Sequence, residues 1–286
     1  MATVGVIGGS GLYQIDGLKD VREVALQTPF GEPSDVFVTG TLEGTPVVFL
    51  PRHGRGHRIS PSEINCRANI WGMKKLGVEA IVSVSAVGSL KLEIKPLDFV
   101  VPDQFIDRTT TRGHTTFFSG GITAHISMAE PVSDEVADIV YQSCEKAGVD
   151  AHKNGTYLNM EGPQFSTKAE SALYRSWGCD IIGMTNLPEA KLAREAEISY
   201  ATLAAVTDYD CWHHSHGTVT VEMIIECLSK NISNAEKILK LAIPRIGRIK
   251  KFSASSALEG AIVTRPDLVP EQKKRELEII IGKYIK

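Results

Sequence analysis

The chain has 286 residues, of which 43% are hydrophobic and 23% charged, and its formal net charge is −3 at pH 7. This composition excludes disordered and fibrous proteins. The small negative charge gives no electrostatic footprint for nucleic acid or an anionic membrane surface, so a bound anion is expected to meet a local cluster of donors. The length suits one large α/β domain, and we predict a single domain over residues 1–286.

The cysteines and the apolar runs indicate where the protein works. The five cysteines are odd in number, scattered and never spaced as Cys-x-x-Cys, a pattern typical of a reducing cytosol. A short apolar run begins at Thr3 without a basic region before it, so no signal peptide is expected. No stretch approaches ~20 uninterrupted apolar residues, so no membrane span is expected. These features predict a cytoplasmic protein.

Short runs of β-branched and apolar residues recur along the chain and predict strands that are covered on both faces. These runs are Thr3–Ile7, Val36–Thr39, Val47–Leu50, Ala80–Ser85, Phe99–Pro102, Thr156–Met160, Asp180–Met184 and Tyr200–Val206.

Helices with readable ends lie between the predicted strands. Capping boxes, in which a hydroxyl residue is followed three positions later by glutamate, predict helix starts at Ser60 and Thr167. Glycines predict the ends of helices at positions 77, 148 and 178. Pro188 opens a further helix, and residues 220–241 predict a long one.

Strands that alternate with helices predict an α/β fold with a central, mixed and mostly parallel twisted sheet flanked by helices. Residues 245–286 are predicted to form a C-terminal extension, with a terminal helix over 270–284 that packs on the rest of the chain. Ligands of such sheets bind beyond the carboxyl ends of the strands. The loops that directly follow strands are therefore the candidate sites.

Three of these loops carry the groups that bind an oxyanion. They are Gly8-Gly9-Ser10-Gly11, the basic run Arg52-His53-Gly54-Arg55-Gly56-His57-Arg58, and Ser85-Ala86-Val87-Gly88-Ser89. Backbone amides, hydroxyls and a guanidinium together suit a tetrahedral anion. A single phosphate fits better than a nucleoside triphosphate, because the chain has no Gly-Lys-Ser/Thr motif. Plain turns and a solvated basic loop are the alternatives.

Asp208-Tyr209-Asp210 follows the last predicted strand. Residues two apart at the end of a strand project to the same side, so both acids can face one ligand. A carboxylate accepts hydrogen bonds, and a carboxyl group kept protonated by burial also donates one. The pair therefore matches the polar edge of adenine, with two solvated turn acids as the alternative.

Two further segments supply other parts of a nucleoside site. Phe165 could stack on a heterocycle, Glu161 could bind sugar hydroxyls, and Met184 could form an apolar wall. The histidines in His213-His214-Ser215-His216 have no second cluster with zinc-ligand spacing, so no metal is expected.

Taken together, these motifs resemble the 5′-methylthioadenosine phosphorylases of the trimeric purine nucleoside phosphorylase superfamily. The resemblance runs in order from Val4 to about Ile246. It rests on Gly8-Gly9-Ser10-Gly11, Arg52-His53-Gly54-Arg55, Asp103-Gln104-Phe105-Ile106-Asp107-Arg108-Thr109, Met128-Ala129-Glu130-Pro131, Glu161-Gly162-Pro163-Gln164-Phe165-Ser166 and Thr207-Asp208-Tyr209-Asp210-Cys211-Trp212.

The resemblance implies a nucleoside phosphorylase fold, phosphorolysis of 5′-methylthioadenosine, and a homotrimer or a dimer of trimers. It implies no cofactor, because inorganic phosphate is the co-substrate. It assigns phosphate binding to Ser10, Arg52, His53, Ser85, Ala86 and Thr185.

It also assigns the residues that bind the nucleoside. Met184 would contact the ribose, Phe165 the base pocket, Asp208 purine N7 and Asp210 the 6-amino group. Val221, together with His125 of an adjacent subunit, would line the 5′-alkylthio pocket, and Ser166 and Val221 would set the specificity.

Other activities stay open. A phosphorylase for 6-oxopurine nucleosides or 5′-methylthioinosine would need a donor such as asparagine at the base, and two aspartates favour an amine instead. Leu50-Pro51-Arg52-His53-Gly54 is also similar to the Arg-His-Gly of histidine phosphatases and phosphoglycerate mutases, which carry it on their first strand. A non-catalytic nucleoside-binding protein is the third alternative.

Overall fold

The structure is a computed structural model that describes residues 1–9, 12, 15–113, 115–213 and 221–285, without the side chains of 221–226 and 228. Its strands are β1 (Thr3–Gly8), β2 (Leu18–Val24), β3 (Phe37–Leu42), β4 (Thr45–Pro51), β5 (Val78–Ser89), β6 (Phe99–Val101), β7 (Gln104–Arg108), β8 (Ala151–Lys153), β9 (Thr156–Met160), β10 (Ile181–Gly183) and β11 (Ser199–Asp208). Its helices are α1 (Cys66–Lys75), α2 (Asp134–Lys146), α3 (Lys168–Ser176), α4 (Glu189–Glu195), α5 (Val221–Ile246), α6 (Glu271–Glu276) and α7 (Glu278–Ile281), with 3₁₀ turns η1 (Pro61–Glu63), η2 (Ser253–Ser256) and η3 (Pro266–Leu268).

The strands form one mixed sheet. Its main path runs in the order β2-β3-β4-β1-β5-β10-β9-β7, and β11, β6 and β8 form a branch from β5. The central strands β4, β1, β5 and β11 are parallel, whereas β2, β3 and β4 form an antiparallel meander at one end. The predicted mixed, mostly parallel sheet is confirmed.

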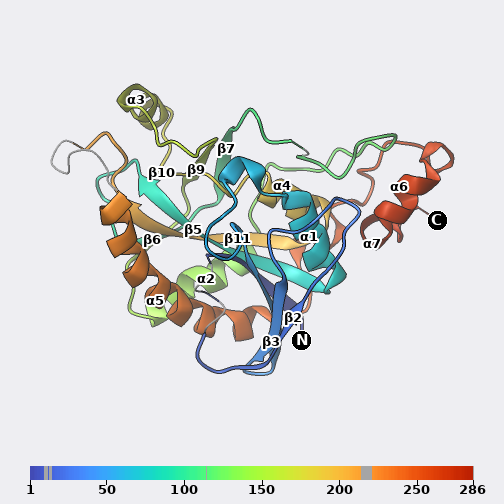
Figure 1. The fold of residues 1–286 in the computed structure, drawn as a ribbon, viewed down its shortest axis with the longest axis horizontal. Helices are drawn as coiled ribbons and strands as arrows, with labels where there is room; N and C mark the ends of the chain where they lie inside the picture. The colour runs from blue at the N-terminus through green and yellow to red at the C-terminus, as the bar shows by residue number, and fades with distance from the viewer. Residues whose placement is uncertain (10–11, 13–14, 114, 214–220, 286) are drawn as a thin grey trace.

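Helices cover both faces of this sheet (Figure 1). On one face α2 and α5 pack against a core that includes Val6 and Leu203. On the other face α1 and α4 pack against a core that includes Ile7 and Tyr200. Successive residues of a strand point to opposite faces, so a strand covered on both sides must be apolar throughout. No helix of the described residues is long and apolar enough to cross a membrane.

Each predicted strand overlaps an observed one, but three short or exposed strands were not predicted. They are β2, β7 and β8. β2 is an edge strand whose residues are mostly exposed, so it lacks the apolar pattern that identifies a covered strand. The predicted loop at Ser85–Ser89 is wrong, because β5 continues to Ser89 between β11 and β10.

One of the two helix starts predicted from capping boxes differs from the structure. The capping box of Ser60 and Glu63 forms, but it caps the 3₁₀ turn η1. The helix α1 starts later, at Cys66, where the side chain of Asn65 accepts a hydrogen bond from the Ala68 amide at 3.1 Å. The capping box of Thr167 and Glu170 starts α3 as predicted.

The C-terminal segment contains less helix than predicted. The expected terminal helix is divided at Leu277 into α6 and α7. These helices lie at one end of the molecule beside α1 (Figure 1), and the indole Nε1 of Trp71 donates to the Glu276 carbonyl at 3.0 Å. The expectation that this segment packs on the rest of the chain is confirmed.

Candidate active site

One edge of β5 changes its neighbour part-way along the strand. β5 pairs with β1 as far as Ser83 and with β10 from Gly88 onward, while β11 follows the other edge. Between these pairings, residues 84–87 have no strand partner on that edge among the described residues. A point where the neighbours of a central strand change is where ligands of α/β sheets bind.

Small and hydroxyl residues occupy this point. The Ser85 side chain is 6% exposed, and its Oγ has no hydrogen-bond partner within the described ranges. Ala86 is exposed, although most of β5 is buried. Thr185, two residues beyond the end of β10, is also buried. Free backbone amides and hydroxyls at a strand edge can hold an oxyanion.

Arg52 follows β4, and its guanidinium is buried in a network of acceptors. It forms a two-point ion pair with Glu189, with Nε–Oε2 at 2.8 Å and Nη2–Oε1 at 3.0 Å. It also donates to the carbonyls of Ile7 and Val84 and to the Ser83 hydroxyl. Burial opposes the charge and Glu189 favours it, with the net result that the pKa of Arg52 is raised. The guanidinium thus ties the ends of β1 and β4 to the middle of β5, and these contacts leave one Nη1 hydrogen for a ligand.

His53 is held as a neutral imidazole. Its Nδ1 lies 2.8 Å from the Ile59 carbonyl, and its ring stacks on His57 with centroids 4.2 Å apart. Burial lowers the pKa of His53 to about 4. Because a carbonyl only accepts, Nδ1 carries the proton and Nε2 is an acceptor. Nε2 is therefore suited to the hydroxyl of a hydrogen phosphate ion.

The remaining cations of the basic run bind groups of their own chain. Arg55 pairs with Glu23 at 2.6 Å, and its amide donates to Asp35 at 2.7 Å. Arg58 donates to the Ser34 carbonyl at 3.2 Å. These contacts point Arg55 and Arg58 toward the β2–β3 side of the sheet.

Asp208 and Asp210 lie beside Gly88, at the end of β11. A methyl group built on Gly88 would lie 3.0 Å from Asp208 Oδ1 and 3.4 Å from Asp210 Cβ. Burial raises the pKa of Asp208 to about 6, against a hydrogen bond from Thr207 Oγ1 at 2.6 Å. Burial also raises the pKa of Asp210, whose Oδ2 has no hydrogen-bond partner in the described chain. One acid can therefore donate a proton while the other accepts.

An aromatic clamp fixes the loop that carries these acids. The indole of Trp212 donates to the Ser89 carbonyl at 2.8 Å, and the Arg175 guanidinium lies 3.7 Å from the indole centroid. Arg175 also donates to the Leu90 carbonyl at 3.0 Å, and Cys211 Sγ donates to the Ser166 carbonyl at 3.3 Å. The end of β5, the acid loop and α3 thus form one unit. The role of Arg175 was not predicted.

The predicted base residue Phe165 lies in the turn between β9 and α3, and the predicted ribose residue Met184 directly follows β10. A Cβ on Gly162, whose φ is +70°, would lie 2.5 Å from Met184 Sδ, so Met184 packs directly against this turn. Phe165 is 52% exposed in the isolated chain. The Ser166 hydroxyl lies 3.7 Å from Met160 Sδ. An exposed aromatic next to the acid loop leaves a ring face available for stacking.

Arg112 is a second positioning cation that was not predicted. Only 4% of its side chain is exposed. It donates to the carbonyls of Met184 at 2.6 Å, Glu161 at 2.9 Å and Leu187 at 2.9 Å. Its Nε also approaches the Glu161 carboxylate at 3.3 Å. Arg112 therefore joins the segments that follow β9 and β10.

The Glu161 carboxylate is occupied by its own chain. It accepts hydrogen bonds from the Ser62 hydroxyl at 2.6 Å and from the amides of Thr110 and Thr111 at 2.5 and 2.9 Å. Burial alone would raise the pKa of Glu161. The hydrogen bonds outweigh this effect and hold the pKa well below its usual range. The suggestion that Glu161 binds sugar hydroxyls gains no support from this arrangement.

Arg112→Met is expected to lower kcat/KM by about 10²-fold, because a displacement of about 1 Å in a site can cost that much. Methionine fills similar space and donates nothing to the three carbonyls. The matched control is Arg248→Met, at an exposed arginine just after α5. Steady-state kinetics of both variants measure the effect, and equal rates for the two would show that the carbonyl contacts do not position the site.

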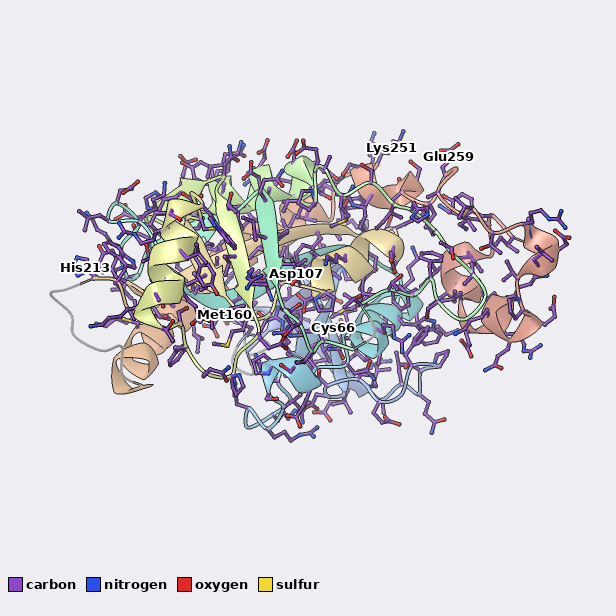
Figure 2. The ribbon with its side chains drawn as sticks, turned by 90° about the horizontal axis from the view of Figure 1, so that it is seen from above. Cys66, Asp107, Met160, His213, Lys251 and Glu259 are labelled. Carbon is purple, nitrogen blue, oxygen red and sulfur yellow. The ribbon has the colours of Figure 1, made fainter. Side chains whose placement is uncertain are left out.

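Not every predicted site residue joins this cluster. The amide of His125 donates to the Ala261 carbonyl at 2.9 Å, in the segment that begins near Glu259. Figure 2 shows His213 near one end of the molecule and Glu259 far from it in the other half. His125 thus lies away from the acids of its own chain. Ser10 lies outside the described residues, as does the side chain of Val221.

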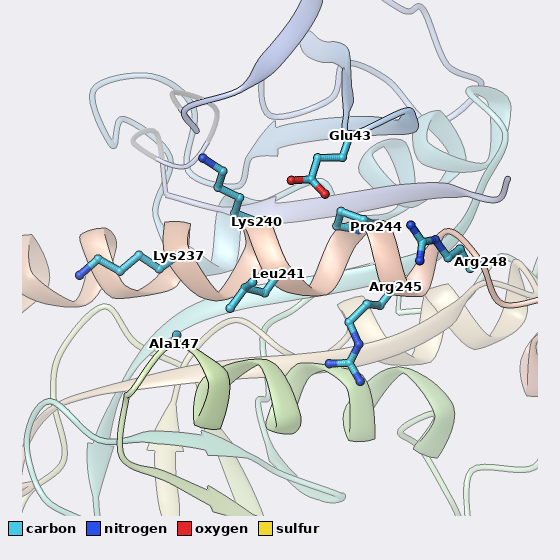
Figure 3. A pocket seen from close by; sticks show the side chains of 8 residues that line it. All are labelled: Glu43, Ala147, Lys237, Lys240, Leu241, Pro244, Arg245 and Arg248. Atoms are coloured by element: carbon cyan, nitrogen blue, oxygen red, sulfur yellow. The ribbon is translucent and has the colours of Figure 1, made fainter.

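A basic hollow lies elsewhere, along α5 (Figure 3). It measures about 450 Å³ and is lined by Glu43, Ala147, Lys237, Lys240, Leu241, Pro244, Arg245 and Arg248. Lys240 pairs with Asp16 at 3.0 Å. None of the predicted site residues lines this hollow, so its cations provide controls for nonspecific effects of charge.

The family model described as the phosphorylase superfamily matches residues 3–244. The chain belongs to the phosphorylase superfamily. It is 58% identical over 283 residues to an S-methyl-5′-thioadenosine phosphorylase of Koribacter versatilis (strain Ellin345), a match that covers 99% of this chain and 97% of the relative. It is 55% identical over 282 residues to one of Geobacter sulfurreducens (strain ATCC 51573 / DSM 12127 / PCA), with 99% of both covered.

Solved structures agree with this assignment. A methylthioadenosine phosphorylase from an antarctic soil metagenomic library has a TM-score of 0.93 and 51% identity, and the match covers 98% of each chain. A single-site mutant of an adenosine/methylthioadenosine phosphorylase from Schistosoma mansoni, in complex with methylthioadenosine, has a TM-score of 0.84 and 38% identity, with 94% of this chain and 100% of that chain covered. The family resemblance predicted from the motifs is confirmed, and the histidine phosphatase alternative is wrong.

Proposed function

We propose that the protein cleaves 5′-methylthioadenosine with phosphate, giving adenine and 5-methylthioribose 1-phosphate in purine and methionine salvage. The observation that carries this proposal is the pair of acids, Asp208 and Asp210, in largely buried positions beside Gly88, one residue beyond the stretch of β5 that lacks a partner on its other edge. The relatives named S-methyl-5′-thioadenosine phosphorylase support it across nearly the whole chain.

The chemistry follows from the charges that develop as the glycosidic bond breaks. A phosphate oxygen forms a bond to C1′ as the C1′–N9 bond breaks, and the electron pair of the broken bond passes to the purine. The ribosyl ring becomes positive, so the phosphate beneath it stabilises the transition state. Asp208 gives its proton to N7, which neutralises the leaving purine. Burial keeps enough of this carboxyl protonated to act as the donor.

Phosphate would be held at the edge of β5. The hydroxyls of Ser85 and Thr185 and the amide of Ala86 are donors there, and His53 Nε2 accepts from the hydroxyl of a hydrogen phosphate ion. Arg52 mainly positions the strand ends and offers its remaining Nη1 hydrogen. Ser10 would complete this set.

The nucleoside would lie between the phosphate and the acid loop. Phe165 would stack on the base, Met184 would contact the ribose, and Asp210 would accept from the 6-amino group. A 6-oxopurine presents a carbonyl there, which repels a carboxylate acceptor. Ser166 and Val221 would set the fit of the substrate.

A homotrimer, alone or as a dimer of trimers, would complete the site. The His125 amide bonds to the Ala261 carbonyl, close in sequence to Glu259, which Figure 2 shows far from His213. That position suits a residue that closes the 5′-alkylthio pocket of an adjacent subunit. We further propose a cytoplasmic enzyme without a cofactor, in which the nucleoside and phosphate are the only small molecules required.

Incubation of the protein with 5′-methylthioadenosine, with and without phosphate, tests the function directly. Adenine should form only when phosphate is present. Double substitution of Lys237 and Arg248 by glutamine, in the basic hollow, should leave the rate unchanged. Preference for 5′-methylthioinosine would favour the 6-oxopurine alternative, and no turnover of either nucleoside would favour a binding protein.

The rate is expected to fall at alkaline pH. The proton donor must be protonated, and burial raises the pKa of Asp208 to about 6, so the active fraction falls about tenfold per pH unit above that value. His53, with a pKa of about 4, stays neutral over this range. A profile of kcat/KM for the nucleoside from pH 5 to pH 9, with phosphate saturating at each pH, measures this limb. A flat profile would contradict the role of Asp208.

A further inference from the structure

Tyr157 is a fully buried phenol whose hydroxyl has no hydrogen-bond partner among the described residues. It lies in β9, between Ile181 of β10 and Phe105 of β7 in register. The edge of its ring packs against Phe105, with centroids 5.8 Å apart. A buried Tyr hydroxyl normally has a partner.

The hydroxyl of Tyr157 crosses β10 toward β5. A Cβ built on Gly183 would lie 1.9 Å from Tyr157 Oη and 3.1 Å from Val87 Cγ1. Only a glycine at position 183 leaves room for this hydroxyl. The phenol therefore reaches the place where β10 meets β5, directly beneath the proposed phosphate site.

The groups around Oη are those assigned to phosphate. Burial raises the pKa of Tyr157, whereas Ser85, Thr185 and Arg52 lie near enough to act in the opposite direction. The phenol stays protonated and is a donor. Ser85 Oγ is likewise buried without a partner in the described ranges.

Two neighbouring hydroxyls without partners indicate that a chain of hydrogen bonds forms when an anion arrives. We propose that Tyr157 is a positioning residue for phosphate: its hydroxyl donates to Ser85 Oγ, so that the serine proton points outward to a phosphate oxygen. This inference rests on the proposed function. Ser85 and Thr185 are slightly exposed at 6% and 7%, whereas Tyr157 is 0% exposed, so Tyr157 acts through Ser85. Hydrogen bonds in such a chain strengthen one another.

Tyr157→Phe tests the proposal, because it removes only the hydroxyl. The KM for phosphate should rise about 2- to 10-fold, the effect of one hydrogen bond, while the KM for 5′-methylthioadenosine stays unchanged. Without phosphate the melting temperature should not fall, because the lost hydroxyl had no partner there. Tyr284→Phe, which removes a phenol that bonds to Glu197 far from the site, is the matched control.

A double-mutant cycle separates positioning from packing. In a Ser85→Ala background, Tyr157→Phe should no longer change the KM for phosphate, because the two side chains act in series. An unchanged phosphate KM in the single variant, an equal rise for both substrates, or additive effects in the cycle would each overturn the proposal.

Phosphate binding without turnover separates this inference from the proposed function. Phosphate alone should raise the melting temperature of the wild-type protein more than that of Tyr157→Phe. If the wild type releases no adenine, the proposed function fails, and this shift still tests Tyr157. Equal shifts in the two proteins would overturn the positioning role.

Discussion

Asp208→Asn is expected to lower kcat for adenine release by about 10²- to 10⁴-fold, the range for loss of a general acid. Asparagine has the shape of aspartate but carries no acidic proton, so the purine must leave as an anion. Burial raises the pKa of Asp208, so the wild-type carboxyl group carries the proton that the asparagine variant lacks. The measurement is the initial rate of adenine formation from 5′-methylthioadenosine and saturating phosphate.

The control for this prediction is Asp267→Asn, an exposed carboxylate that pairs with Arg265 at 2.7 Å, and it should keep the full rate. An asparagine at position 208 can donate to a purine N7 or carbonyl, so the variant is also expected to gain some activity toward the inosine analogue. Unchanged adenine release by Asp208→Asn would refute the assignment of this residue as the acid.

Arg52→Gln is expected to destabilise the fold by about 3–5 kcal/mol, because it leaves the Glu189 charge buried without its partner. Glu189 is 1% exposed, and it also accepts from Ser83 and Tyr200 at 2.8 Å each. Those neutral donors cannot replace a guanidinium. The shift in the urea midpoint at constant protein concentration measures the loss.

The matched control is Arg265→Gln. Its ion pair with Asp267 is exposed, with side chains 71% and 64% accessible, so its loss should cost at most about 1 kcal/mol. If Arg52→Gln kept its stability and lost only phosphate affinity, the guanidinium would be a ligand for phosphate rather than the link between the strand ends.

The architecture could be predicted because the local sequence pattern identifies most of its strands. Covered strands such as β11 are apolar on both faces, and alternation with helices fixes the fold class. The segments that were predicted wrongly lack such a local pattern. β2 is mostly exposed, and Ser85-Ala86-Val87-Gly88-Ser89 has the composition of a loop. Only the neighbouring strands β10 and β11 keep that segment extended.

The site could be predicted in part for the same reason. Asp208 ends β11 and Asp210 follows it, so their position in the sequence indicates that both lie at one end of the sheet. Ser85 was predicted near them as a loop residue, although it lies within β5. Arg112 bonds to carbonyls as far as 75 residues away, and Arg52 meets Glu189 across 137 residues. Nothing local in the sequence distinguishes such a cation from a solvated one, so long-range contacts had to supply these roles.

The continuation of β5 to Ser89 fixes the distance between two parts of the candidate site. Ser85 and Gly88 are three residues apart on one extended strand, which sets a span of about 10 Å between the proposed phosphate site and the residue beside Asp208 and Asp210. Ser85 and Gly88 cannot move independently, because both belong to one strand that is hydrogen-bonded in the middle of the sheet. Substitutions in the surrounding loops can therefore change the fit of a substrate while the span from Ser85 to Gly88 stays the same.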